Sequence, residues 1–162
     1  MQHEPKFIDL LSVFDRHGVE HIVVGGVAAG FAGAPIITLD LDVVFRRTKE
    51  NASRLEAALR EVEAIYRDPA GRRIIPDVER LLTAKIHLLE TRLGYLDVLA
   101  SIGAGWHFED LEPRSSNLQV AGLTVRVLDL AAVIESKEHA NRPKDRNMLS
   151  ELRETLRMKG GS

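Results

Sequence analysis

The feature that most constrains this chain is a strand-like segment carrying two aspartates on one face. In TLDLDVVF, residues 38 to 45, apolar side chains occupy every second position. This period of two is typical of a β-strand with one face in a core. It places Asp40 and Asp42 together on the other face, although aspartate is disfavoured in strands. The pair therefore demands a chemical explanation.

The rest of the chain mixes helical and strand-like patterns. Apolar residues recur at helical spacing in residues 5–17 and 49–62, and a short helix is expected around residues 77–82. Strands are expected at 21–24, 84–91 and 94–101, with hairpins at 64–76 and 117–128. Two C-terminal helices, 129–140 and 143–157, precede a frayed tail from Met158. This order predicts an α+β (mixed α/β) fold, a mixed β-sheet flanked by helices.

Length and composition limit the possible functions. The chain has 162 residues, of which 44% are hydrophobic and 28% charged, which suits one domain spanning residues 1–162, with C-terminal helices from about residue 129. A net charge of -2 provides no general field for nucleic acid or an anionic membrane. The absence of cysteine excludes disulfides and thiolate catalysis. No apolar run approaches the ~20 residues of a membrane span, so we expect a cytoplasmic protein without a membrane partner.

Two carboxylates at alternate strand positions suit a divalent cation. Close carboxylates repel each other, and burial increases the cost. A bound Mg²⁺ or Mn²⁺ would remove both penalties, and oxygen-only ligands favour these ions over zinc. Gly25 and Gly26 precede the strand, and a loop without Cβ atoms lets phosphate oxygens approach the backbone closely. Metal and phosphate are therefore expected at one place, although a solvated acidic face is the alternative.

A third carboxylate would complete a site for two metal ions. Asp97 interrupts the apolar segment GYLDVLAS, residues 94 to 101, much as Asp40 and Asp42 interrupt theirs. It would join them if the two strands are neighbours.

Together these motifs resemble the DNA polymerase β-type nucleotidyltransferase superfamily. The similarity rests on VVGG, thirteen further residues, DLDV and the later LDVL, and it continues through VLDLAAVIESKEHANRPKDRNML. It covers roughly residues 7 to 155. The chain is most similar to small prokaryotic members related to the AbiEii-type toxins and the minimal nucleotidyltransferases.

The resemblance implies transfer of a nucleoside monophosphate from an NTP to an acceptor hydroxyl on tRNA, a protein or a small molecule. It also implies a toxin–antitoxin context, with a cognate antitoxin or other partner protein. The implied catalytic residues and ligands of two Mg²⁺ (or Mn²⁺) ions are Asp40, Asp42 and Asp97. The implied nucleotide-binding residues are Gly25, Gly26, Thr38, Lys137, Arg142 and Lys144.

One position departs from the family pattern. Many relatives have an arginine shortly before the first aspartate, where this chain has Ile36. Thr38 is retained, but the cation is missing. The alternative function is therefore a domain that has lost turnover and serves as a nucleotide-binding or partner-binding module. Lys137 could equally be a surface lysine on a charged helix, and Asp145 a residue complementing a helix dipole.

Overall fold

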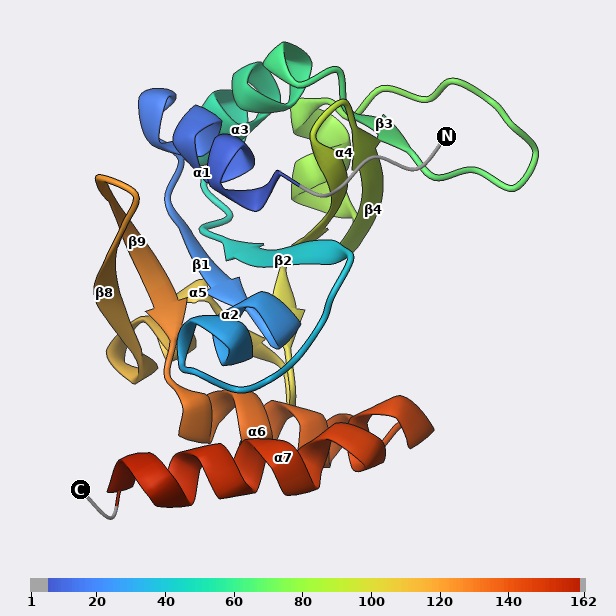
Figure 1. The fold of residues 1–162 in the computed structure, drawn as a ribbon. Helices are drawn as coiled ribbons and strands as arrows, with labels where there is room; N and C mark the ends of the chain where they lie inside the picture. Colours follow the sequence, from blue (N-terminus) through green and yellow to red (C-terminus); the bar gives the residue numbers. More distant parts are fainter. Residues whose placement is uncertain (1–5, 161–162) are drawn as a thin grey trace.

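A mixed seven-stranded sheet runs through the molecule in the order β3-β4-β5-β2-β1-β9-β8 (Figure 1). The chain was analysed as a computed structural model that describes residues 6–160. β1 pairs in parallel with β9, and β2 with β5, while the other neighbours are antiparallel. The strands are β1 (His21–Val24), β2 (Asp40–Phe45), β3 (Ile65–Tyr66), β4 (Ile86–Thr91), β5 (Gly94–Leu99), β8 (Ser115–Val120) and β9 (Leu123–Leu128). The predicted mixed sheet flanked by helices is confirmed.

Helices cover the sheet from both sides (Figure 1). On one side lie α1 (Phe7–Arg16), α3 (Lys49–Glu61) and α4 (Val78–Thr83). On the other lie α2 (Gly25–Phe31), α6 (Leu130–Ala140) and α7 (Pro143–Gly160). A two-stranded hairpin, β6 (Ser101–Ile102) with β7 (Trp106–His107), leads into α5 (Phe108–Leu111). The central strands are buried on both faces, as Val23 and Val43 illustrate on one face and Ile22 and Val44 on the other.

Short local signals set most element ends. The Thr48 side chain accepts a hydrogen bond from Asn51 N at the start of α3, and Asp77 caps α4 in the same way. Asn141 ends α6 in the left-handed conformation, and Pro143 begins α7. These signals explain why α3, α4 and α6 lie within one residue of their predicted ranges.

Two predictions about local structure were wrong. The predicted hairpin at 64–76 has its turn, since Gly71 N donates to Asp68 O, but its second arm forms no strand. Instead β3 pairs antiparallel with β4, and the segment that follows extends from the body as a loop (Figure 1). The predicted frayed tail is helical from Met158 to Gly160, and Lys159 Nζ there donates to Ala32 O at 2.9 Å. Pro5, the predicted first residue of α1, and the last two residues lie outside the described part.

Within residues 6–160, no helix combines the length and apolarity needed to cross a membrane.

Candidate active site

Strand pairing brings the three aspartates to one face of the sheet. Asp42 on β2 is the register partner of Asp97 on β5, and Asp40 lies two residues before Asp42 on the same face. The two strands are neighbours although 55 residues separate these partners. All three side chains line one pocket of about 450 Å³. The acidic residues singled out in the sequence therefore converge on a shared cavity.

The glycine turn closes tightly onto this acidic face. Gly25 has φ +66°, and a Cβ there would stand 2.4 Å from Asp42 Oδ2. Gly26 is close as well, since its Cβ would lie 3.2 Å from the Thr38 Cβ. Any larger residue at position 25 would strain the backbone and push the carboxylate aside. Thr38 lies beside the turn and donates from Oγ1 to Asp40 O at 3.2 Å.

Burial and nearby negative charge raise the pKa of two of these carboxylates, Asp42 and Asp97. Desolvation, followed by the charges of Asp97 and Asp40, raises the pKa of Asp42 to about 8, although Lys137 opposes the shift. The pKa of Asp97 is also raised, chiefly by desolvation, with Arg67 opposing it. Asp42 Oδ1 is buried and has no hydrogen-bond partner among the described residues. The site thus holds more negative charge than its surroundings satisfy.

Arg67 is a site residue that the sequence did not indicate. It follows β3, and its guanidinium pairs with Asp97 Oδ1 and lies 3.9 Å from Asp40 Oδ1. The same group stacks over the Tyr95 ring, 5.0 Å from the centroid. Only the pairing of β3 with β4, and of β4 with β5, carries Arg67 to the aspartates. Nothing in the local sequence distinguishes it from the other arginines of its loop.

The predicted cationic residues lie on the opposite wall, where an unexpected partner holds two of them. Lys137 and Arg142 both bind Asp145, with Lys137 Nζ 3.3 Å from Oδ1 and Arg142 Nε 2.6 Å from Oδ2. Asp145 is 0% exposed and Lys137 only 8% exposed. Lys137 is thus not the surface lysine of the alternative interpretation, and Lys144 lines the pocket nearby. Asp145 does more than complement a helix dipole, because it joins α6 to α7.

The remaining wall of the pocket is apolar. Ile86 and Leu88 on β4 are 62% and 44% exposed, and together with Leu99 and Ile102 they border the aspartates. Ile36, in contrast, packs against the hydrophobic core and does not line the pocket. The pocket therefore has a cationic side, an acidic middle and an apolar side.

The donor set fits a hard divalent cation, although the carboxylates do not gather around one point. Among the described residues, no group of three or more His, Cys, Asp or Glu side chains is arranged to hold a metal ion. Two observations nevertheless fit Mg²⁺ or Mn²⁺: the orphaned buried oxygen of Asp42 and the glycine at position 25, where a Cβ would strike that carboxylate. Oxygen-only donors are those that these ions prefer.

Comparison with solved structures identifies the fold. LnuA, a lincosamide antibiotic adenylyltransferase solved with lincomycin, superposes with a TM-score of 0.61 at 13% identity, covering 93% of this chain and 98% of LnuA. ANT(2″)-Ia in complex with adenylyl-2″-tobramycin gives 0.59 at 17% identity, covering 93% and 87%. The solution structure of ANT(2″)-Ia, an antibiotic-resistance factor, gives 0.59 at 16% identity, covering 96% and 83%.

By sequence alone, the chain matches no protein-family model and no curated protein. The likeness to these enzymes is thus one of architecture. The fold is that of the nucleotidyltransferases, as the motifs predicted.

Proposed function

We propose that this protein is a Mg²⁺-dependent nucleotidyltransferase that transfers a nucleoside monophosphate from an NTP to an acceptor hydroxyl. The observation that carries the proposal is the pairing of Asp42 with Asp97 across neighbouring strands, beside Asp40 and beneath a glycine turn that touches Asp42. Two neighbouring strands with only a structural role would not be expected to place three carboxylates in one cavity. The raised pKa values of Asp42 and Asp97 are the cost expected of a site built to receive cations.

Each wall of the pocket has a part in the proposed reaction. Gly25 and Gly26 leave room for phosphate oxygens at the backbone, beside Thr38. Lys137, Arg142 and Lys144 face the triphosphate as cationic partners, with Asp145 holding the first two in place. Phosphate binding thus belongs to the β1 and α6 side of the pocket.

The acceptor approaches from the other side. In-line displacement requires the attacking oxygen and the leaving pyrophosphate to lie on opposite sides of the α-phosphorus. Asp97 stands on the β5 side of Asp42, so its carboxylate takes the proton of the attacking hydroxyl there. When bound by Asp40, Asp42 and Asp97, Mg²⁺ supplies charge neutralisation at the α-phosphate and the leaving pyrophosphate.

The same site supports a second candidate function, a nucleotide-binding or partner-binding module without turnover. Ile36 favours it, because the position where many relatives carry an arginine is apolar here and faces the core. Loss of one phosphate-facing cation would reduce stabilisation of the transition state more than it would reduce binding.

Calorimetric titration with each NTP, with and without Mg²⁺, followed by assay of released pyrophosphate, separates the two functions. For the enzyme we expect Mg²⁺-dependent binding and pyrophosphate release, with Asp42→Asn lowering release by roughly 10³-fold or more. Glu151→Gln, an exposed carboxylate on α7, is the matched control and should retain full release. Metal-dependent binding without pyrophosphate, across all acceptors, would leave only the binding module.

The acceptor and the biological setting are proposed from the motif resemblance. We propose that the chain belongs with the small prokaryotic AbiEii-like members, which its motifs resemble, and that it has a toxin–antitoxin role with a cognate partner protein. Incubation with α-labelled NTP and, separately, bulk tRNA, cell protein and hydroxylated antibiotics identifies the acceptor by the fraction that retains label. If expression arrests growth, the Asp42→Asn variant should relieve the arrest. An arrest that persists in this variant would contradict a toxin acting by transfer.

A further inference from the structure

Arg67 closes a row of side chains that crosses the active-site face. Its backbone N donates to Leu88 O on β4, Leu88 is the register partner of Asp97, and Asp97 is the partner of Asp42. The guanidinium therefore reaches back along the row from the edge strand. It binds Asp97 and lies near Asp40.

The hydrogen bonding of Arg67 is incomplete. Its Nε is buried without a hydrogen-bond partner among the described residues. A guanidinium has five donors in a fixed fork and normally binds a carboxylate through two of them. Here a single positive charge spans two carboxylates, and Asp42 has no cation in contact. The arrangement neutralises the acidic face only in part.

Arg67 and a divalent ion compete for the same oxygen. The lone pairs of Asp97 Oδ1 that accept from the guanidinium are those that a metal ion at the three aspartates would use. Two cations sharing that oxygen would also repel each other in a partly desolvated site. This explains why three carboxylates line one pocket while no metal-binding group is assembled among the described residues.

We propose that Arg67 is a built-in counter-ion of the active site, which holds Asp97 and Asp40 in the free protein and is displaced from them when the divalent metal binds. The inference rests on the proposed function in that it takes the three aspartates as metal ligands. Arg67 is a positioning residue in this scheme, because it acts through the carboxylates. Arg67, which directly follows the edge strand β3, also provides the site with a cation, whereas Ile36 provides none.

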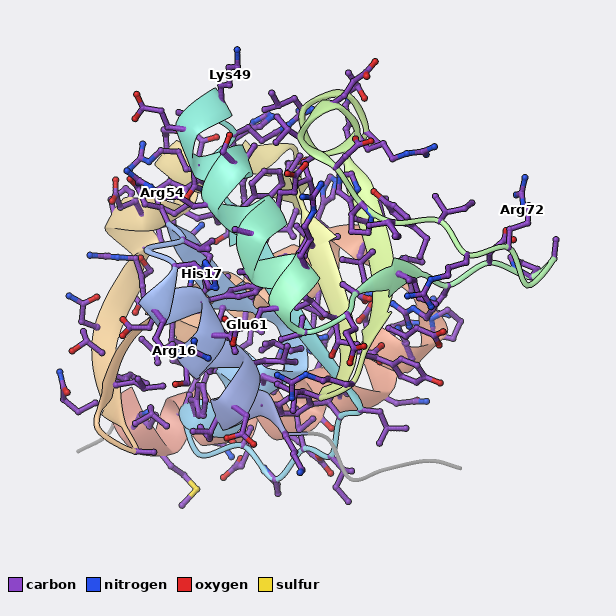
Figure 2. All side chains as sticks on the ribbon, turned by 90° about the horizontal axis from the view of Figure 1, so that it is seen from above. Arg16, His17, Lys49, Arg54, Glu61 and Arg72 are labelled. Carbon is purple, nitrogen blue, oxygen red and sulfur yellow. The ribbon has the colours of Figure 1, made fainter. Side chains whose placement is uncertain are left out.

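Exchange links the metal site to the loop that follows β3. Arg67 is the first residue after β3, and the segment from Asp68 to Pro76 projects from the body (Figure 1). Its tip carries Arg72, which lies far out on the loop (Figure 2) and pairs with Asp68. Release of Arg67 from Asp97 removes the ion pair that fastens the base of this loop to the sheet.

The test measures Mn²⁺ binding in the absence of nucleotide. Binding is monitored by calorimetry and by the electron paramagnetic resonance signal of free Mn²⁺. Arg67→Gln removes the competing charge, so we expect it to bind Mn²⁺ about tenfold tighter than wild type or more. Arg67→Lys keeps a charge without the fork and should fall between the two. Arg72→Gln, from the same loop, is the matched control and should bind as wild type does.

Equal or weaker Mn²⁺ binding by Arg67→Gln would overturn the inference. A gain shared by Arg72→Gln would also overturn it, because the effect would then be a general change in charge. Absence of Mn²⁺ binding in every variant would sink the exchange and the metal dependence together. A gain confined to Arg67→Gln, without pyrophosphate release from any NTP, would uphold the exchange and refute the transferase.

Wild-type protein provides a second measurement that does not depend on how a variant folds. In a sample labelled with ¹⁵N at arginine Nε, the Arg67 signal should move and exchange faster with solvent as Mg²⁺ is added, while the Arg72 signal stays. An Arg67 signal unaffected by saturating Mg²⁺ would contradict the exchange.

Discussion

Two acidic groups line the same pocket with opposite charge balance. On the sheet, Arg67 is close to Asp97 and Asp40 but makes no ion pair with Asp42. On the helices, Asp145 alone is held by Lys137 and Arg142. Carboxylates outnumber cations in the first group, and cations outnumber the carboxylate in the second.

The pKa shifts follow this balance. Burial raises the pKa of Asp42 to about 8, with help from its acidic neighbours. Burial also acts upward on Asp145, but hydrogen bonds from Arg142 and the charge of Lys137 outweigh it, so the pKa of Asp145 is lowered. A carboxylate whose charge is paired by cations can join structural elements, whereas one without such a partner is available to bind a cationic ligand. The helix-side group is therefore structural as well as cationic, and the sheet-side group keeps a carboxylate oxygen without a hydrogen-bond partner among the described residues.

The largest expected effect breaks the satisfied group. Asp145→Ala leaves Lys137 buried with its charge unpaired, so we expect a loss of about 3 kcal/mol in the free energy of unfolding. Urea denaturation at pH 7 measures it. Glu138→Gln is the control, because it removes an exposed ion pair between the same two helices, Glu138 with Arg153 at 3.1 Å, and should cost less than about 1 kcal/mol. Equal losses of unfolding free energy in the two variants would show that the ion pairs of Asp145 stabilise the fold no more than an exposed ion pair does.

An intermediate effect of opposite sign is expected at Asp42. Its pKa is raised from 3.8 to about 8, so the folded protein keeps a proton that the unfolded chain releases. Wild-type stability must then fall as pH rises between these two values. The Asp42→Asn variant has no ionisable group at position 42. Its free energy of unfolding should therefore exceed that of wild type by on the order of 2 kcal/mol at pH 8.5, and should differ little at pH 4.

Urea denaturation of both proteins in EDTA across this pH range tests the difference. Glu50→Gln, which alters an exposed carboxylate in α3, should not show the trend. A constant difference between Asp42→Asn and wild type would mean that Asp42 is already ionised at low pH.

The smallest expected effect separates stability from NTP binding at the cations near Asp145. Arg142 is 56% exposed at its side chain, and Lys137 remains with Asp145 when Arg142 is lost. Arg142→Gln should therefore cost less than about 1 kcal/mol, near 2 to 4 °C in melting temperature, while weakening NTP binding. Differential scanning calorimetry with parallel NTP titration measures both. Lys144→Gln, which does not pair with Asp145, should weaken NTP binding without lowering the melting temperature.

Most of the secondary structure followed from the sequence because its determinants are local. The alternation in residues 38 to 45 and the helical spacing of residues 49 to 62 needed only neighbouring residues. The prediction failed where partners are distant. The arm of the expected hairpin after Gly71 formed no strand. It keeps one backbone hydrogen bond to β3, from Tyr66 N to Ile74 O, while β3 pairs with the distant strand β4.

The candidate site divides in the same way. Asp40, Asp42 and the glycine turn lie within one segment, so their shared chemistry is visible from spacing alone. Asp97 could be suspected as a charged interruption of an apolar strand. Arg67 and Asp145 gave no such sign, because their significance depends on what lies opposite them. The roles assigned to all these residues in nucleotide transfer stay predictions.

By itself, the sequence determined the period-two strand with its paired aspartates, the preceding glycines, and thereby the class of fold. Only the tertiary structure decided which charges meet: Arg67 with Asp97, and Lys137 with Asp145. The physical reason is range. Strand periodicity and capping arise between residues close in the chain, whereas the free energy of a buried charge depends on every group that folding brings around it.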